Sequence, residues 1–173
     1  MEQHGDPPPL RPCVMVMGPS GVGKSTFAEA LAVALEADFI EGDDHHPPAN
    51  RAAMAAGTPL TDAMRAPWLA ALAAAVRAAR SRRAVVFSCS ALKRSYRDSL
   101  REGIGPLRIV SLTAPAGLIR TRMGQRRHFM PSALLDSQIE TLQPPEADEA
   151  AITLDMSRSL AEVLHEAVAQ LRH

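Results

Sequence analysis

Residues 13–26 read CVMVMGPSGVGKST, an apolar run that leads directly into a glycine-rich segment. The run from Cys13 to Met17 is short and unbroken, which is typical of a strand covered on both faces. Residues 18–25 match the phosphate-loop pattern of Gly, four residues, Gly, Lys and then Ser or Thr. Residues 24–35 then place apolar side chains on one helical stripe. This order of strand, loop and helix predicts a parallel α/β sheet with a phosphate site at its first turn.

The glycine-rich segment has the chemistry of a nucleotide site. Its glycines let consecutive backbone amides turn inward around phosphate oxygens, and the following helix adds its positive end. Lys24 can reach the β and γ phosphates, and the Ser25 hydroxyl is placed to coordinate Mg²⁺. A glycine-rich turn without a ligand is the alternative, but only two of the 19 basic residues are lysines, so a lysine here is not compositional noise. We expect ATP and Mg²⁺ to bind at Gly18, Pro19, Ser20, Gly21, Val22, Gly23, Lys24, Ser25 and Thr26.

Strands and helices alternate along the rest of the chain. This alternation predicts about five parallel strands with helices on both faces of the sheet. In such sheets ligands bind beyond the carboxyl ends of the strands. Further strands are predicted at 38–40, 84–88, 107–113 and 151–155, and further helices at 48–56, 67–81, 93–102, 115–126, 132–142 and 159–172.

Length and composition favour one globular domain. The 173 residues are 46% hydrophobic and 22% charged, which argues against a disordered, fibrous or membrane protein. Residues 1–12 are polar and proline-rich and are expected to form a flexible arm, with a single domain over 13–173. The longest apolar stretch, 69–76, is too short for a bilayer. Two cysteines are too few for a disulfide framework, so a cytoplasmic protein with no membrane partner is expected.

Charge is balanced overall but not along the chain. The 19 basic and 19 acidic residues cancel, whereas residues 77–127 hold 13 basic side chains and only two acidic ones. This excess indicates either an anionic ligand or solvated helix faces. A nucleic-acid partner is not expected, because six aromatic residues in the whole chain provide no stacking platform.

A dense polar cluster, GDDHHPPAN at 42–50, follows the second predicted strand. A carboxylate here could accept a proton from an attacking hydroxyl or hold a metal-bound water. His46 could hydrogen-bond a substrate oxygen. The alternative is a helix cap by Asp44 followed by a solvated turn.

Three segments give the chain a family resemblance. Residues 42–69, GDDHHPPANRAAMAAGTPLTDAMRAPWL, resemble the gluconate kinase pattern of GD, HP, N, G-x-PL-x-D and R-x-PWL. The segments CSALKRSYRDSL at 89–100 and QIETLQPPEADE at 138–149 resemble the family's CSALK, YRD, Q-x-ETL and ADE motifs. Shikimate kinases share the size and fold, but their glycine triplet after the third strand is missing here.

The resemblance implies a phosphate-loop kinase of the nucleoside monophosphate kinase type, with a mobile lid and acceptor-binding helices at about 45–81. Its implied activity is ATP-dependent phosphorylation of D-gluconate to 6-phosphogluconate, feeding the pentose phosphate pathway, in a homodimer. A kinase for another hydroxylated acid such as shikimate, or a nucleotide-dependent nucleic-acid binder, is the alternative.

Candidate gluconate ligands follow from the resemblance. The gluconate carboxylate needs a cation, for which Arg51, Lys93 and Arg97 are candidates, and Asp43 and His46 are candidates for the hydroxyl chain. Each has an ordinary alternative, which for Arg97 is an ion pair with Asp98 or Glu102. Asp43 is the expected base, with Asp44 as its rival. The third strand carries no acidic residue for Mg²⁺, so Asp43 is also expected to hold the metal together with Ser25.

The lid is expected at about 120–131. Closing arginines can stabilise charge on the transferring phosphoryl group and exclude water. Residues 122–129, RMGQRRHF, resemble the family's R-x-x-x-R-K-G-H-F but are one residue shorter and lack the glycine, which predicts altered closure. Arg120 and Arg127 are the catalytic candidates, and Arg120 and Arg126 the nucleotide-binding ones. A basic helix face exposed to solvent is the alternative.

Overall fold

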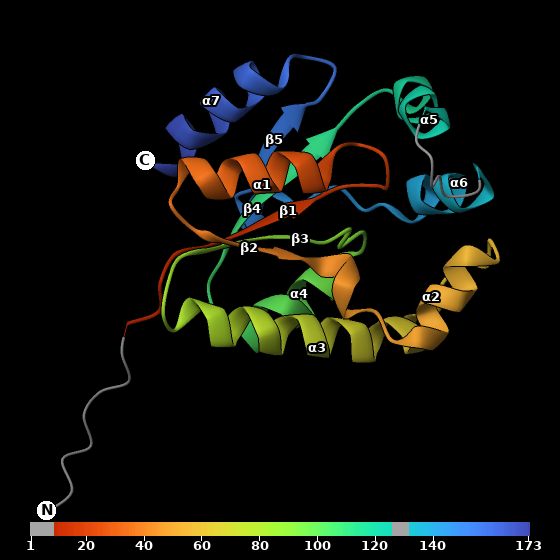
Figure 1. Ribbon diagram of the computed structural model, residues 1–173, viewed down its shortest axis with the longest axis horizontal. Coiled ribbons are helices and arrows are strands. Elements are labelled where there is room, and N and C mark those ends of the chain that lie inside the picture. Colours follow the sequence, from red (N-terminus) through yellow and green to blue (C-terminus); the bar gives the residue numbers. More distant parts are fainter. Residues whose placement is uncertain (1–8, 126–131) are drawn as a thin grey trace, which may run out of the picture.

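A parallel five-stranded sheet organises the chain in the computed structural model, which describes residues 9–125 and 132–173 (Figure 1). The strand order is β2-β3-β1-β4-β5, and every adjacent pair is parallel. The predicted sheet is therefore confirmed. The strands are β1 Cys13–Met17, β2 Asp38–Glu41, β3 Val85–Ser88, β4 Arg108–Thr113 and β5 Ile152–Asp155.

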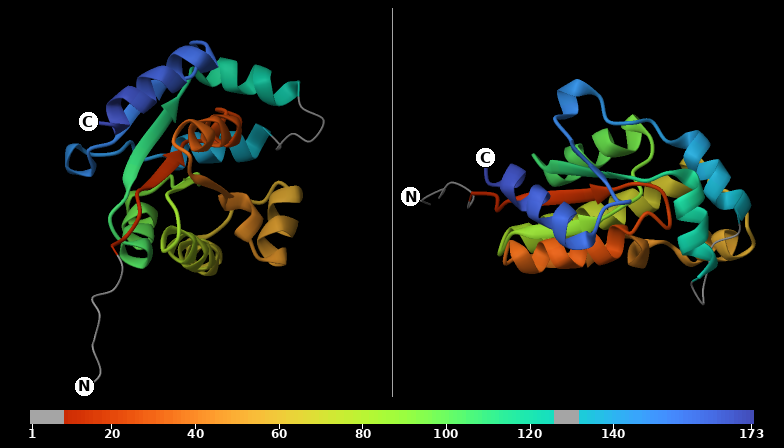
Figure 2. Two further views of the ribbon diagram at one scale, coloured as in Figure 1. Left: turned by 60° about the vertical axis from the view of Figure 1, so that its left-hand side comes forward. Right: turned by 90° about the horizontal axis from the view of Figure 1, so that it is seen from above.

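Helices cover both faces of the sheet, as the alternation predicts. In Figures 1 and 2, α1 and α7 lie on one face, and α3 and α4 lie on the other. The three helices α2, α5 and α6 gather beyond the carboxyl ends of the strands, at the right of Figure 1. The helices are α1 Lys24–Ala34, α2 Pro48–Ala55, α3 Asp62–Arg80, α4 Arg94–Ile104, α5 Ala116–Gly124, α6 Ser132–Thr141 and α7 Leu160–Leu171, with short 3₁₀ helices η1 Gly42–His45 and η2 Ala147–Glu149.

The central strand β1 divides the apolar core into two layers. Val14 and Val16 face the layer under α1 and α7, whereas Cys13, Met15 and Met17 face the layer over α3 and α4. All five side chains are buried, so the unbroken apolar run of the sequence reflects burial on both faces. Within the described residues no helix is long and apolar enough to cross a membrane.

Helix α3 begins five residues before the predicted start at Pro67. The Thr61 hydroxyl accepts a hydrogen bond from the Met64 amide at 3.2 Å and caps the helix at that point. The helix accommodates Pro67 in its second turn, where only one backbone hydrogen bond is lost. The earlier start places Arg65 on the helix, facing the carboxyl edge of the sheet.

The carboxyl ends of β2 and β3 approach each other unusually closely at Gly42. A Cβ atom on Gly42 would lie 2.0 Å from the Ser88 carbonyl oxygen. The Gly42 amide instead donates to the Ser88 hydroxyl at 3.3 Å, and the Gly42 carbonyl accepts from the Trp68 indole at 2.9 Å. Only glycine fits between these groups, so the cluster that follows β2 sits directly against the end of β3.

We predict that Gly42→Ala lowers the free energy of unfolding by about 2 kcal/mol or more, because the new methyl group forces the two strand ends apart. Urea unfolding measures the change. Gly117→Ala is the matched control, since a Cβ on Gly117 meets nothing within 4 Å. It should leave stability unchanged or raise it by up to about 1 kcal/mol. Equal effects of the two substitutions would contradict the close approach.

Candidate functional site

The phosphate loop joins β1 to α1 and closes on itself. Gly23 caps α1 with a left-handed φ of 105°, a conformation that favours glycine. The Lys24 ammonium donates to the Pro19 carbonyl at 3.0 Å, so the lysine folds back over the loop. The Ser20 amide donates to the Gln138 side-chain oxygen at 2.8 Å, which connects the loop to α6. The loop therefore presents its amides and its lysine at the carboxyl edge of the sheet.

Glu41, the last residue of β2, lies beside the hydroxyl of the loop. The Ser25 hydroxyl donates to one Glu41 carboxylate oxygen, and the Ser88 hydroxyl donates to the other at 2.6 Å. The Asp43 amide also donates to Glu41, at 3.4 Å. The expected magnesium site of Ser25 and Asp43 stays a prediction, and the carboxylate in direct contact with Ser25 is that of Glu41.

The oxygen donors around Ser25 fit a magnesium ion. Mg²⁺ prefers oxygen ligands and is usually bound by one or two carboxylates together with substrate phosphates. The Ser25 hydroxyl and the Glu41 carboxylate supply such oxygens next to the phosphate loop. Among the described residues no group of three or more His, Cys, Asp or Glu side chains could hold a metal by itself. The donor set therefore suits a nucleotide-bound Mg²⁺ better than a metal held by protein alone.

A cleft beside the phosphate loop gathers residues from five parts of the chain. Asp43 and His46 come from the polar cluster, as expected, and Lys24 faces the same cleft. Arg65 and Trp68 reach it from α3, and Gln138 from α6. The remaining lining residues are Ser20, Met54, Pro59, Leu60, Ser90, Leu134 and Ser137.

Asp43 is the carboxylate of this cleft. Desolvation raises the pKa of Asp43 above its ordinary value, while the charge of Lys24 acts in the opposite direction. The raised pKa makes the carboxylate more basic, and solvent still reaches 71% of its side chain. Asp44 is exposed and does not line the cleft.

Among the residues that the structure describes, Arg65 is the arginine that lines the cleft. Its guanidinium donates to the Tyr96 hydroxyl at 2.8 Å and lies 5.1 Å from the centre of the Tyr96 ring. The Tyr96 hydroxyl in turn donates to Asp62. These contacts hold the guanidinium in one orientation. The sequence interpretation missed Arg65, although it is the first residue of the quoted R-x-PWL motif.

Two side chains predicted to bind the gluconate carboxylate, Arg51 and Lys93, lie near the cleft but are bound to other groups of the protein. Arg51 donates to the backbone carbonyls of Asp44 at 2.9 Å and His46 at 3.3 Å, so it braces the polar cluster. Lys93 forms an ion pair with Asp62 at 3.1 Å. Neither side chain lines the cleft.

Arg97 does not face the cleft, and its prediction as a gluconate ligand is wrong. Its side chain is 0% exposed and forms a two-point ion pair with the equally buried Glu149, at 2.7 and 3.0 Å. The remaining guanidinium nitrogen donates to the carbonyls of Ala91 at 3.0 Å and Leu92 at 3.3 Å. Every nitrogen of the guanidinium is thus satisfied inside the protein, and the partner is neither Asp98 nor Glu102.

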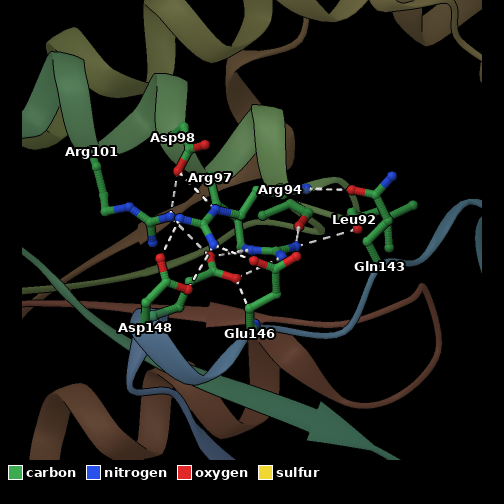
Figure 3. Close-up of polar contacts among 10 residues, drawn as sticks. Leu92, Arg94, Arg97, Asp98, Arg101, Gln143, Glu146 and Asp148 are labelled. Carbon is green, nitrogen blue, oxygen red and sulfur yellow. Dashed lines mark hydrogen bonds and ion pairs between the residues drawn. The ribbon is translucent and has the colours of Figure 1, made fainter.

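The same region explains part of the excess of basic residues in the middle of the chain. Figure 3 shows the arginines of α4 converging on the acidic segment that precedes β5. Arg94 pairs with Asp148 and Glu146 at 2.7 and 2.6 Å, and Arg101 pairs with Glu149 at 2.9 Å. These three arginines are therefore neutralised within the protein and are not part of a surface for an anionic ligand.

The lid arginines divide into three cases. Arg120, on α5, is exposed and forms an ion pair with Asp136 of α6. Arg126 and Arg127 lie outside the described residues. Arg122 donates to the Met156 carbonyl at 2.7 Å and, with Arg158, lines a hollow beside Gly21 and Thr26 on the outer side of the phosphate loop.

A larger cavity of about 390 Å³ lies at the opposite edge of the sheet, around the amino ends of β1 and β3. Its lining is mostly apolar and includes Leu35 and Leu171. The Arg80 guanidinium that borders it is already bonded to the carbonyls of Arg11 and Pro106. The groups suited to phosphoryl transfer are at the carboxyl edge, so the candidate active site is the cleft and not this cavity.

The chain is similar to known kinases over most of its length. The family model described as AAA domain matches residues 13–145. A gluconokinase of Gluconobacter oxydans (strain 621H) is 43% identical over 97% of this chain and 96% of its own. The thermoresistant gluconokinase of Escherichia coli (strain K12) is 42% identical over 87% of each chain. The crystal structure of a gluconokinase from Sinorhizobium meliloti 1021 has a TM-score of 0.83 and 47% identity, covering 94% of this chain and 93% of that one.

We predict that Glu149→Gln lowers the free energy of unfolding at pH 7 by about 3–5 kcal/mol, because Arg97 would remain buried without a countercharge. Burial raises the pKa of Glu149, but hydrogen bonds from Arg97, the Glu146 amide and Arg101 outweigh it and lower the value from 4.5 to about 2. Because the folded pKa is the lower one, the stabilisation is present above about pH 4.5 and is lost as the pH falls towards 2.

Urea unfolding of both proteins between pH 7 and pH 2 measures this difference. The gap between wild type and Glu149→Gln should shrink as the pH falls. Asp148→Asn is the control, because its side chain is 64% exposed and such pairs contribute about 1 kcal/mol or less. A Glu149→Gln variant that is as stable as Asp148→Asn would refute the role of the buried pair.

Proposed function

The chain belongs to the gluconokinase family, and we propose from this membership and from the cleft that it transfers the γ-phosphoryl group of ATP to D-gluconate, giving 6-phosphogluconate. One observation carries the proposal. One cleft is lined by the ammonium group of Lys24 from the phosphate loop, the carboxylate of Asp43 and the oriented guanidinium of Arg65. These are the groups that a donor phosphate, an attacking hydroxyl and an acceptor carboxylate require.

The phosphate loop is proposed to bind the triphosphate. Its backbone amides and the positive end of α1 offer donors to phosphate oxygens, as in other phosphate loops. Lys24 would move from the Pro19 carbonyl to the β and γ phosphates and neutralise charge there. The Ser20 amide would exchange the Gln138 oxygen for a phosphate oxygen.

Magnesium is proposed to bind at Ser25 and Glu41, with Asp43 close by. When bound, the ion would neutralise charge on the phosphates and orient them. Glu41 is well placed for this, since the Ser88 hydroxyl already orients its carboxylate.

Asp43 is proposed as the general base for the acceptor hydroxyl. Its carboxylate faces the same cleft as Lys24, so a hydroxyl bound there would lie between the base and the transferring phosphate. His46 is expected to contact an acceptor oxygen from the floor of the cleft.

Arg65 is proposed to bind the gluconate carboxylate. A guanidinium can hold a carboxylate at two points, and Tyr96 keeps this one oriented. Arg51 and Lys93 stay candidates outside the cleft. Arg51 already donates to backbone carbonyls, and Lys93 is paired with Asp62.

The nucleotide base is proposed to lie between Arg122 and Arg158, whose planar guanidinium groups can stack on an aromatic ring. Arg120, Arg126 and Arg127 stay predictions for the closing lid, as do the homodimer and the cytoplasmic location.

We predict that gluconate is phosphorylated with a kcat/KM on the order of 10²-fold or more above that for glucose, because the neutral sugar leaves the acceptor cation unpaired. An ADP-release assay with ATP, Mg²⁺, gluconate, glucose and shikimate measures this. Arg65→Gln should remove most of the preference, chiefly by raising KM for gluconate. Arg51→Gln is the matched control and should retain it. If Arg51→Gln alone loses the preference, the gluconate carboxylate binds at Arg51 and not at Arg65. Absence of any turnover with gluconate would refute the proposed substrate.

We predict that Asp43→Asn lowers kcat by about 10²-fold or more, because asparagine keeps the shape of the side chain but cannot accept the proton. Binding of gluconate should change less than kcat. Asp44→Asn is the control and should have little effect, since this side chain lies outside the cleft. Steady-state kinetics at saturating ATP compares the two variants. A greater loss in Asp44→Asn would show that the base is placed wrongly.

A further inference from the structure

The floor of the acceptor cleft contains a buried chain of polar groups. The His46 ring stacks on Trp68, with 4.0 Å between ring centroids and 17° between planes. The Asn50 side-chain nitrogen lies 3.2 Å from the Nδ1 atom of His46 and 2.9 Å from the Met64 carbonyl oxygen. The Nε2 atom of His46 faces the cleft, 3.8 Å from the Asp43 carboxylate. Asn50 is only 2% exposed and His46 only 7%, so water does not compete for these contacts.

The contacts of Asn50 determine which His46 nitrogen carries the proton. A carbonyl oxygen can only accept, so the Asn50 atom that faces Met64 must be the amide nitrogen. The second hydrogen of that nitrogen points at His46 Nδ1, which must therefore be an unprotonated acceptor. In a neutral imidazole the proton then resides on Nε2. The ring presents an N–H donor to the cleft and turns its lone pair away from it.

We propose that Asn50 is a positioning residue that holds His46 as the Nε2–H tautomer, so that the ring presents its single N–H donor to an acceptor hydroxyl bound in the cleft beside Asp43. The kinetic part of this inference rests on the proposed gluconate kinase activity, whereas the tautomer itself does not. It follows that His46 is not the base of the reaction, because its only lone pair is occupied by Asn50. Donor and base are thereby assigned to separate side chains, His46 and Asp43.

The charges around His46 favour the same neutral ring. The charges of Arg51 on α2 and Arg65 on α3 act on the imidazole, Lys24 at the start of α1 lines the same cleft, and the Asp43 carboxylate lies 3.8 Å from Nε2. Burial, followed by the charges of Arg51 and Arg65, lowers the pKa of His46 to about 4. A second proton on Nδ1 would also oppose the Asn50 amide donor directly. The ring is therefore neutral at pH 7.

Nitrogen-15 NMR of the histidine side chains tests the tautomer without any substrate. We expect the wild-type spectrum at pH 7 to show His46 with a protonated Nε2 and a bare Nδ1, assigned by its absence from His46→Gln. Asn50→Asp replaces the amide donor by an acceptor, so the proton should move to Nδ1 or the ring should become doubly protonated. Asn50→Leu removes the donor without adding a charge, and it should give a mixture of the two tautomers.

Kinetics with gluconate tests the consequence. The amide nitrogen of glutamine reaches the position of Nε2, whereas that of asparagine reaches the position of Nδ1. His46→Gln should therefore keep kcat within about 5-fold of wild type, and His46→Asn should lose about tenfold more. Asn50→Asp should lower kcat by about tenfold or more in the wild-type background, but by less than about twofold in the His46→Gln background.

The spectra and the kinetics each have an outcome that would overturn the assignment of His46 as an Nε2–H donor. A wild-type ring protonated on Nδ1 would overturn the inference, as would a His46 tautomer unchanged in both Asn50→Asp and Asn50→Leu. If Asn50→Asp does not fold, the wild-type and Asn50→Leu spectra decide alone. Equal kcat losses in His46→Gln and His46→Asn would overturn the donor role. A wild-type protein that does not phosphorylate gluconate but shows the expected tautomer would instead refute the proposed function.

Discussion

A single carboxylate at the end of β2 joins the parts of the site. Glu41 accepts hydrogen bonds from Ser88 at the end of β3, from Ser25 at the start of α1 and from the backbone of Asp43. These contacts are possible because parallel strands end at the same edge and because Gly42 lets β2 and β3 approach without a side chain between them. The phosphate loop, the proposed metal ligands and the proposed acceptor cleft all take their relative positions from this junction.

The fold and the phosphate loop could be predicted from the sequence because their signals are local. The five strands, their parallel arrangement and the helix after the loop follow from short apolar runs and one contiguous motif. The acceptor side was less predictable. Whether an arginine faces a cleft or the interior depends on partners far along the chain, and the partner of Arg97 lies 52 residues away at Glu149. Arg65 was missed for a different reason, because Pro67 suggested a later start for α3.

The structure separates the charges that hold the protein together from those that face the cleft. The α4 arginines and the acidic residues around η2 neutralise one another, partly in complete burial (Figure 3). A buried pair of this kind contributes little net stability over apolar residues, but removal of one partner is costly. The cleft keeps a smaller set of charges, chiefly Lys24, Asp43 and Arg65, whose positions suit anionic ligands.

The rarity of lysine in this chain has a practical consequence. The sequence contains only Lys24 and Lys93, and the structure brings both to the carboxyl edge of the sheet, one at the phosphate loop and one beside α3. Arginine supplies the other 17 basic side chains and does not react with amine-selective reagents. Among amino groups, acylation of this protein would therefore modify only the N-terminal amine and the two lysines at the margins of the candidate active site. A fluorophore or an immobilising support attached through amines would accordingly block the site, so coupling through another functional group is required.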